Sequence, residues 1–267
     1  MNTIMAGIQN VGFMHWQVAI AILALLQPWI ITLYEKYLKP QRIQIFEAGK
    51  VEIGYSNLGP TIGLNGTMKA ENNSVFVQTV ELELVRENDK STHNFEASFF
   101  RSNKIRISPN IDMEIELASG FMVTTIQPHR FNILFVDNKA QRELEKTVEE
   151  FWQEWILYLQ KRKGEDMSQA HMLPFDNNKY YEEYFKMSIH VNTYTKVERI
   201  RYWEPGKYKM TLKVKTDNPD REFKSTLNFS ITESDAKLLS FNSLEILKTI
   251  CGVGTNIWNF ANCIYEK

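Results

Sequence analysis

Apolar residues follow one another almost without interruption at the start of the chain. No Asp, Glu, Lys or Arg occurs in residues 1–34, and residues 16–34 read WQVAIAILALLQPWIITLY. A helix of about 20 apolar residues spans a hydrocarbon core of about 30 Å, and a helix satisfies all of its own backbone hydrogen bonds in lipid. The pattern therefore predicts an N-terminal transmembrane helix that serves as a membrane anchor.

Particular residues define this predicted anchor and its orientation. Pro28 would kink the helix, and Gln27 beside it can hydrogen-bond a freed carbonyl group or a partner helix. Aromatic rings favour the headgroup level at the two ends of such a helix, and here they belong to Trp16, Trp29 and Tyr34. The residues that set the topology follow the helix and are Lys36, Lys39 and Arg42. Because basic flanks stay inside, we expect a single-pass protein of the cell membrane with a cytoplasmic C-terminal domain.

Two alternatives to an anchor remain open for the same stretch. A secretory signal peptide begins with a basic region and ends at a small-residue cleavage site, and nothing basic precedes the apolar run here. A buried N-terminal helix of a soluble protein is the second alternative. The anchor explains the absence of charge best.

From Ile43 onward the pattern changes to a period of two residues. Apolar residues alternate with acidic ones in 80–84 and 111–117, and with lysines and a threonine in 208–215. Such alternation is typical of antiparallel strands with one buried and one solvated face. Asp217-Asn-Pro-Asp220 indicates the turn of a hairpin that continues in 223–231. Several short strands broken by turn residues predict a β-sandwich.

Helical spacing returns in two places. Apolar residues recur every three or four positions from Leu144 to Leu159, behind a capping box at Asn138, and Gly164 follows a basic run that suits a helix end. Together with the tyrosines near 180, this predicts a helical insertion over 138–185. Residues 244–265 carry one broad apolar face and predict a C-terminal helix. That helix packs on the sandwich, lies at the membrane interface, or crosses the membrane a second time.

The segment Trp203-Glu-Pro-Gly-Lys-Tyr208 resembles the turn that leads into a late strand of many immunoglobulin-like sandwiches. The resemblance covers few residues and implies an architecture but no function; the strand lengths also fit an arrestin-like sandwich. The predicted protein is therefore mainly β. Residues 1–42 form the tail, anchor and basic flank, and residues 43–267 form an immunoglobulin-like antiparallel β-sandwich with the helical insertion and the C-terminal helix.

Composition narrows the class of function. The chain has 31 Lys and Arg against 32 Asp and Glu, so its formal net charge is −1. A protein that neutralises nucleic-acid phosphates needs a basic excess or stripe, so we expect no nucleic-acid partner. Cys251 and Cys263 would lie about 18 Å apart along a helix, too far for a disulfide, which fits a reducing compartment.

No catalytic, metal or nucleotide motif stands out. The histidines occur without the spacing of a zinc site; they are His15, His93, His129, His171 and His190. The glycine-rich stretch 54–67 lacks the Lys and the following helix of a phosphate cradle. We interpret it as bulges and tight turns, or as an edge that accepts a partner strand. No cofactor or metal is expected.

Aromatic and glycine residues make up a candidate recognition surface. Trp and Tyr give a large contact area at a small entropic cost. Core packing is the alternative, because the spacing of the helical aromatics is also what packing on a sheet requires. The candidates are Gly59, Pro60, Gly63, Trp152, Trp155, Tyr181, Tyr184 and Trp203.

These observations support a non-catalytic interaction or sensing module, anchored by one membrane pass, with a cytoplasmic β-sandwich. Tethering would raise its local concentration near partners, which we expect to be the lipid membrane and another protein or a second copy. One alternative is a membrane homo-oligomer or pore-forming effector, associating through Gln27, Pro28 and nearby alanines. The other is an enzyme with scattered residues, which a polar pocket joining His129 or His171 to an acid and a nucleophile would favour.

Overall fold

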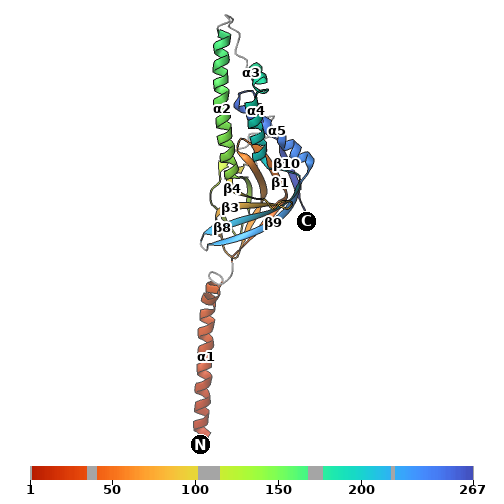
Figure 1. The fold of residues 1–267 in the computed structure, drawn as a ribbon. Coiled ribbons are helices and arrows are strands. Elements are labelled where there is room, and N and C mark those ends of the chain that lie inside the picture. Colours follow the sequence, from red (N-terminus) through yellow and green to blue (C-terminus); the bar gives the residue numbers. More distant parts are fainter. Residues whose placement is uncertain (1, 35–40, 102–114, 168–176, 218–219, 267) are drawn as a thin grey trace, which may run out of the picture.

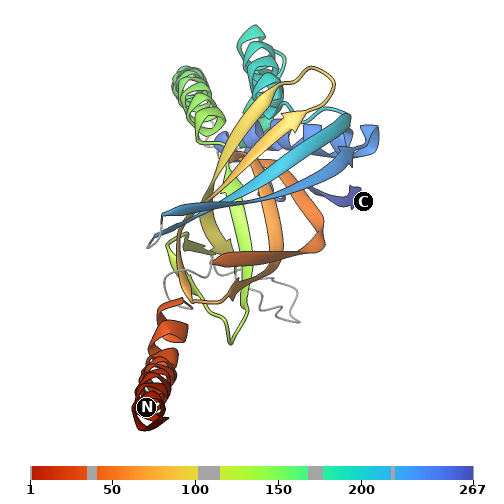
Figure 2. The ribbon, with the colours of Figure 1, turned by 90° about the horizontal axis from the view of Figure 1, so that it is seen from below.

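Alternating residues build ten strands in the described part of the chain, and a computed structural model arranges them as one antiparallel sheet that closes on itself (Figures 1 and 2). The structure describes residues 2–34, 41–101, 115–167, 177–217 and 220–266. The strands are β1 (Arg42–Ser56), β2 (Gly59–Glu71), β3 (Val75–Arg86), β4 (Thr92–Arg101), β5 (Ile115–Leu117), β6 (Phe121–Val123), β7 (His129–Val136), β8 (Gly206–Asp217), β9 (Arg221–Ile231) and β10 (Phe260–Glu266).

Eight strands form a closed barrel in the order β4-β7-β2-β1-β10-β9-β8-β3, and a further pairing of β3 with β4 completes the circle. That closure runs from Glu81 opposite Glu96 to Val85 opposite Thr92. The two short strands extend the sheet beyond the closure, because β5 pairs with the end of β4 and β6 with the start of β3. The predicted β-sandwich is therefore wrong, immunoglobulin-like form included. Alternation reports which face of a strand is buried, and it is the same in a sandwich and in a barrel.

The barrel interior is filled by side chains from every long strand. Inward-facing residues of β1, β2 and β8, such as Ile53, Ile62 and Leu212, are at most 1% exposed. An eight-stranded barrel is just wide enough for its own side chains to fill it. The barrel is thus a packed core, and the helices are positioned by their attachment to it.

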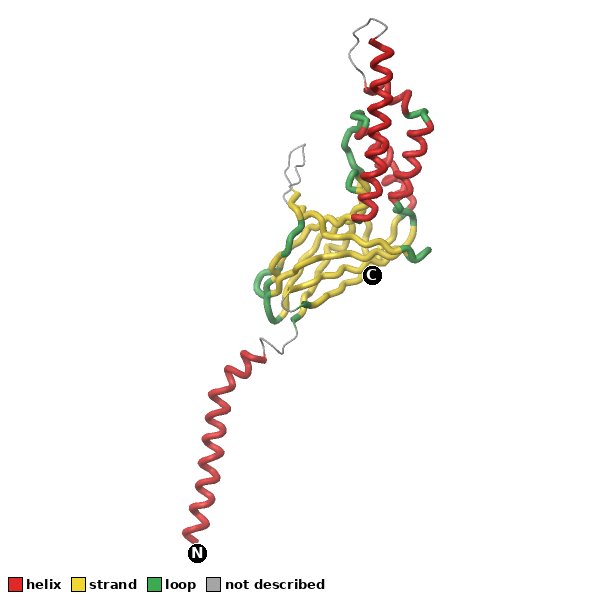
Figure 3. Tube along the Cα trace, turned by 60° about the vertical axis from the view of Figure 1, so that its left-hand side comes forward, coloured by secondary structure: helices red, strands yellow, loops and turns green. Residues whose placement is uncertain are grey.

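Five helices complete the described part of the chain (Figures 1 and 3). They are α1 (Asn2–Leu33), α2 (Asn138–Met167), α3 (Asn177–Tyr184), α4 (Ser188–Arg201) and α5 (Glu233–Ile250). We call α2, α3 and α4 the helical extension, which rises from one end of the barrel. It is longer than the predicted insertion 138–185, because α4 continues it to Arg201 where the sandwich was expected to resume.

The C-terminal helix over 244–265 is also wrong. Helix α5 ends at Ile250, Gly252 follows with a φ of 72°, and the chain then forms strand β10. In β10 alternate residues are buried, Ala261 and Cys263 among them. Burial in residues 260–266 thus alternates with a period of two. Both faces of this strand carry apolar residues, and the sequence analysis assigned all of them to one broad face of a helix. Both cysteines are free and buried.

Helix α1 leaves the barrel at the end opposite the helical extension (Figure 1). Pro28 lies inside the helix, and the Thr32 hydroxyl donates a 2.7 Å hydrogen bond to the Pro28 carbonyl oxygen. Within the described part of the chain, no helix has the length and apolar character needed for a membrane crossing. The predicted transmembrane helix and single-pass anchor are therefore wrong.

The predicted topology-setting residues have little structural description. Lys36 and Lys39 lie outside the described residues, and Arg42 begins β1 opposite Glu71 of β2. The cytoplasmic placement of the barrel stays a prediction.

Candidate functional site

Helix α1 presents the largest continuous group of exposed apolar side chains. Trp16, Leu25 and Trp29 are 72%, 74% and 71% exposed. Between Trp16 and Tyr34, where side chains are described, exposed apolar residues occur on every side of the helix. Contiguous apolar surface of this kind marks an interaction site. Trp16, Gln27, Pro28, Trp29 and Tyr34, which the sequence grouped as a membrane anchor, all belong to this surface.

Along one side of α1 runs a hollow of about 410 Å³. Its lining residues are Ile20, Leu23, Ala24, Gln27, Ile30 and Ile31. Gln27 is the single polar side chain among them. An amide in an otherwise apolar lining is both a donor and an acceptor, so it favours a partner that also offers both.

A polar cluster lies where β7 passes into α2. The Tyr202 hydroxyl donates a 2.9 Å hydrogen bond to Asp137 Oδ2, and His93 Nδ1 is 3.8 Å from the same oxygen. The rings of His93 and Tyr202 stack with their centroids 3.7 Å apart. Asp137 Oδ1 accepts hydrogen bonds from the backbone N–H groups of Lys139 and Ala140, each at 3.0 Å. Asp137 is therefore the N-cap of α2.

The electrostatics of this cluster suit a structural role. Burial acts to raise the pKa of Asp137, but hydrogen bonds from His93, the Ala140 N–H and Tyr202 outweigh it and hold the pKa below its ordinary value. Burial, and then the charge of Asp137, raises the pKa of Tyr202. General acids and bases work best with pKa values near the working pH. A carboxylate held ionised beside a phenol held protonated fixes the start of α2 without exchanging protons at neutral pH.

Replacing Asp137 by Asn is expected to destabilise the fold by about 1–2 kcal/mol at pH 7, because it removes the charge that favours the N-terminus of α2 and strengthens the bond from Tyr202. A carboxyl whose folded pKa is depressed stabilises the fold above its ordinary pKa of about 3.9, and this is lost as the pH falls through the folded pKa. The difference between wild type and D137N should therefore shrink below about pH 4. Urea unfolding at pH 7 and pH 3 measures it, with E154Q, at an exposed position of α2, as the control. The same pH dependence in both variants would contradict the assignment.

A polar hollow of about 720 Å³ opens at the end of the barrel where β1 begins. It is lined by Thr67, Met122, Thr124, Gln127, Pro128, His129 and Arg130. His129 stacks on Phe121 with ring centroids 4.3 Å apart, and burial lowers its pKa. Its described lining holds no carboxylate, Ser or Cys, and the described residues contain no group of three potential metal ligands. The acid that would favour an enzyme is therefore not among the described lining residues of this hollow, and His171 lies outside the described residues.

Aromatic rings fill the interior of the helical extension. Trp155 of α2 packs against Tyr181 and Tyr184 of α3, with centroid distances of 6.4 and 5.1 Å. The Tyr181 hydroxyl lies 2.9 Å from Nε2 of His190 in α4, and burial lowers the pKa of His190. All four side chains are buried. They join the three helices to one another.

The other candidate recognition residues lie apart from this cluster. Trp203 is fully buried beside the barrel core, and Gly59, Pro60 and Gly63 are buried in β2. Trp152, on α2, is 49% exposed. The structure thus does not bring the eight residues into one groove, and recognition by them stays a prediction. The stretch 54–67 offers no free sheet edge, because β2 pairs with β1 on one side and β7 on the other.

A partly buried ion pair on the barrel wall was not predicted from the sequence. Arg101 of β4 pairs with Glu52 of β1, and its Nε donates a 3.0 Å hydrogen bond to Asn132 Oδ1 in β7. A Cβ atom on Gly63 would clash with the Arg101 guanidinium, so the glycine makes room for this crossing. The signal was present as a glycine inside an apolar strand, which marks the close approach of another group.

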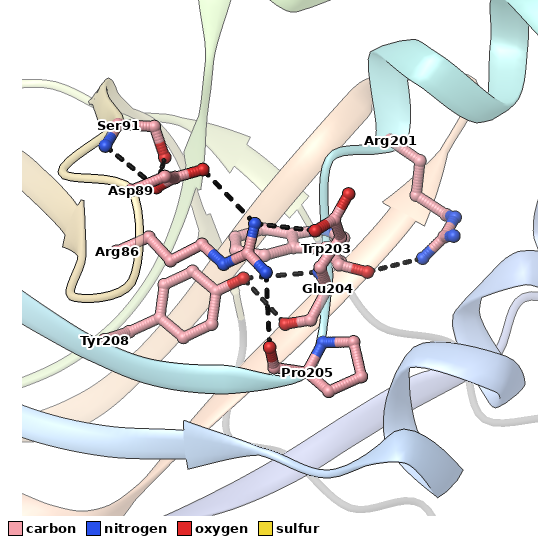
Figure 4. A network of polar contacts seen from close by, with 8 residues as sticks. All are labelled: Arg86, Asp89, Ser91, Arg201, Trp203, Glu204, Pro205 and Tyr208. Atoms are coloured by element: carbon pink, nitrogen blue, oxygen red, sulfur yellow. Dashed lines mark hydrogen bonds and ion pairs between the residues drawn. The ribbon is translucent and has the colours of Figure 1, made fainter.

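A second polar network ties the β3–β4 turn to the segment before β8 (Figure 4). Arg86 Nη1 lies 3.3 Å from Asp89 Oδ2 and 2.6 Å from Glu204 Oε2, and Arg86 Nη2 donates a 3.3 Å hydrogen bond to the Pro205 carbonyl oxygen. The Tyr208 hydroxyl donates a 2.8 Å bond to the Glu204 carbonyl oxygen. The segment that resembled an immunoglobulin-like turn is thus an anchored entry into a barrel strand.

No protein-family model matches the sequence, and no curated protein matches it. A family 123 glycoside hydrolase from Clostridium perfringens aligns with 72% of this chain, at 10% identity and a TM-score of 0.30. Spo0M, a sporulation control protein from Bacillus subtilis, aligns with 70% of this chain, at 6% identity and a TM-score of 0.23. The aligned regions span 27% and 48% of those two chains. Scores this low carry no argument about fold or function.

Proposed function

We propose that the protein is a non-catalytic interaction module that forms homo-oligomers through α1 and so presents several copies of its barrel together. The exposed apolar surface of α1 is the observation that carries this proposal. Helix α1 has 32 residues, which corresponds to a length of about 48 Å. A helix that is apolar on all sides is normally buried, and its own copies provide an equally long and uncharged partner.

The spacing of residues along α1 supports self-association. Ile20, Leu23, Gln27 and Ile30 follow each other at intervals of three, four and three residues and line the hollow of α1. This is the a/d spacing of a coiled coil, in which a single polar residue at an a position specifies the register. In a parallel pair the Gln27 amides of two copies lie opposite each other, and each supplies the donor and the acceptor that the other needs.

A non-catalytic role fits the polar clusters of the barrel. Asp137 and Tyr202 are held in protonation states that do not exchange near neutral pH, and the hollow at His129 has no carboxylate among its described lining residues. These features support a binding role for the protein over a catalytic one.

Cysteine cross-linking of the full chain tests the self-association of α1. Leu23 lies in the hollow and Leu25 outside it, and both side chains are exposed, at 60% and 74%. We expect a short bis-maleimide to produce covalent dimers of L23C but not of L25C, because a and d positions face their own copies in a parallel bundle. The native thiols of Cys251 and Cys263 are buried, and burial raises their pKa values to about 12. They should therefore not react with the cross-linker.

Equal cross-linking of L23C and L25C would point to non-specific apolar contact and would count against the proposed register. The absence of any dimer in either variant, with an unchanged monomeric mass in sedimentation, would remove the proposal. The unaltered chain serves as the background control.

A further inference from the structure

A cavity of about 200 Å³ lies between α2 and α5, close to the barrel. The residues that line it are Leu144, Glu145 and Val148 of α2, and Ile246, Thr249 and Ile250 of α5. Asn57, in the turn between β1 and β2, and Trp258, which precedes β10, also line it. We call it the α2–α5 cavity. It is bordered by the helical extension, by α5 and by the barrel.

Hydrogen bonds hold the walls of this cavity in place. The Asn242 side chain of α5 bonds Asn259 through its amide nitrogen at 2.8 Å and through its amide oxygen at 3.0 Å. Glu245 Oε1 accepts a 2.9 Å hydrogen bond from the backbone N–H of Asn256. These bonds join the chain on both sides of Trp258 to α5, so the cavity exists before a ligand arrives. A preformed site loses little conformational freedom on binding.

The cavity is largely apolar and has the size of a small ligand. Leu144, Val148, Ile246 and Ile250 supply aliphatic side chains, and Trp258 supplies an aromatic ring. An apolar cavity of about 150 Å³ binds benzene, so the volume here admits one ring with a short side chain. Small-molecule sites combine such apolar walls with a few polar groups that set the orientation of the ligand.

Thr249 is one of these polar groups. Its hydroxyl oxygen is buried and has no hydrogen-bond partner among the described residues. Three other helical threonines satisfy this group within the helix: Thr147, Thr193 and Thr195 each donate a bond of 2.8 or 2.9 Å to the carbonyl oxygen four residues earlier. Gly254 lies close against the Thr249 hydroxyl on one side, where a Cβ atom would collide with it. A buried polar atom without a partner calls for an explanation, such as a ligand that bonds to it.

Glu145 gives the lining of the cavity a negative charge. Its Oε1 accepts a 2.9 Å hydrogen bond from the side-chain amide of Gln141. No Lys or Arg belongs to the described lining. The face of an indole ring, here that of Trp258, also attracts a cation. These groups select a cationic ligand over an anionic one.

We propose that the α2–α5 cavity binds a small primary amine whose apolar body is about the size of one aromatic ring. The body packs against Val148, Ile250 and Trp258. The ammonium group, which has three N–H donors, bonds to the Glu145 carboxylate and to the unpartnered Thr249 hydroxyl. A bound amine thus contacts α2, α5 and the approach to β10 together, and it stabilises the junction between the helical extension and the barrel.

This inference concerns the α2–α5 cavity and does not depend on α1. A failure of the α1 cross-link therefore leaves it intact, and its own failure leaves self-association through α1 intact.

Fluorine NMR of the full chain, labelled with 5-fluorotryptophan, tests this site with 2-phenylethylamine as the probe. The chain has six tryptophans, and W258F identifies the resonance of Trp258. We expect a saturable shift of that resonance, with a dissociation constant of about 1 mM or below. Phenylacetate has the same ring and the opposite charge and should bind about tenfold more weakly, whereas 2-phenylethanol, the neutral analogue, should lie between them.

Matched variants separate the charge from the apolar walls. E145Q should weaken binding of 2-phenylethylamine about fourfold and leave binding of 2-phenylethanol within about a factor of 1.5. E149Q removes the same charge from an exposed position of α2 outside the lining, and should leave both affinities within about a factor of 1.5. V148F places a ring inside the cavity and should weaken both ligands about tenfold or more.

T249V separates the effect of the hydroxyl on binding from its effect on folding. Valine keeps the shape of the side chain and removes the buried, unpaired oxygen, so the melting temperature should be equal or higher. Binding of 2-phenylethylamine should nevertheless weaken about threefold. A lower melting temperature with an unchanged affinity would overturn the role of Thr249.

Thermal unfolding first establishes that these variants are folded. A saturable shift of the Trp258 resonance that E145Q weakens and E149Q does not supports the proposal. The absence of such a shift up to about 10 mM amine overturns it, as does equal binding of the amine and phenylacetate. Shifts confined to Trp16 and Trp29 would place the amine on the exposed surface of α1, and would overturn it as well.

Discussion

Replacing Trp203 by alanine should lower the free energy of unfolding by about 3–5 kcal/mol, the range for a fully buried Trp. Trp203 is 0% exposed, and its ring lies 6.0 Å from that of Phe95 and 6.3 Å from that of Tyr208. Its indole N–H donates a 2.8 Å hydrogen bond to the Gly54 carbonyl oxygen. Truncation leaves a cavity between β1, β4 and β8 and an unpaired buried carbonyl, and both costs act in the same direction.

Chemical denaturation of the full chain measures this loss, with two companion variants. W203F keeps most of the ring but removes the N–H donor, so it should cost about 1–2 kcal/mol. W152A changes the same residue type where it is 49% exposed on α2, and should cost less than about 1 kcal/mol. If W203A cost no more than W152A, the central place of Trp203 in the barrel would be refuted.

The second large effect is expected at Asn242 in α5. Its side chain is 0% exposed and makes four hydrogen bonds. Nδ2 donates to the carbonyl oxygens of Tyr55 and Asn259, at 2.7 and 2.8 Å, and Oδ1 accepts from the backbone and side-chain nitrogens of Asn259, each at 3.0 Å. One amide therefore joins α5 to the end of β1 and to the approach to β10.

N242A should destabilise the fold by about 3–5 kcal/mol, because it leaves several buried backbone groups unpaired at about 1–3 kcal/mol each. Hydrogen exchange provides a local readout: amides of α5 and β10 should exchange faster, whereas those of β7 should be affected only through global stability. N228A, at an exposed Asn of β9, should stay within about 0.5 kcal/mol of wild type. Unchanged protection in β10 would show that Asn242 does not hold this junction.

The predictable part of the fold is the part that local pattern determines. The alternation in 80–84 lies in β3, and the hairpin expected around Asp217–Asp220 is formed by β8 and β9. The amphipathic pattern from Asn138 is α2, but its N-cap is Asp137 and not Asn138, and the helix continues past Gly164 to Met167. In each case neighbouring residues carry the information, since side-chain periodicity depends only on local backbone geometry.

The closure of the barrel depends on pairings that periodicity does not report. Glu81 of β3 lies directly opposite Glu96 of β4, an arrangement of like charges that argues against pairing when read locally. Lys215 Nζ lies 2.6 Å from Glu81 Oε1, and Asn138 Nδ2 donates a 2.7 Å bond to Glu96 Oε2. Each carboxylate is thus satisfied by a different, distant element, and only the assembled structure reveals this.

The polar clusters could not be predicted from the sequence for the same reason. Asp137 and Tyr202 are separated by 65 positions in the sequence, and neither belongs to a recognisable motif. The aromatic residues at 155, 181, 184 and 203 were singled out as residues with a role, but sequence could not say whether the rings point inward. The structure shows that all four rings are buried. For the rings at 155, 181 and 184, this burial results from the packing of α2, α3 and α4 against one another.

Helix α1 and the helical extension lie at opposite ends of the barrel (Figure 1). If α1 helices associate in parallel as proposed, the barrels of all copies lie at the same end of the bundle. The helical extensions then form the far end of the assembly, where several copies of α3 are presented together.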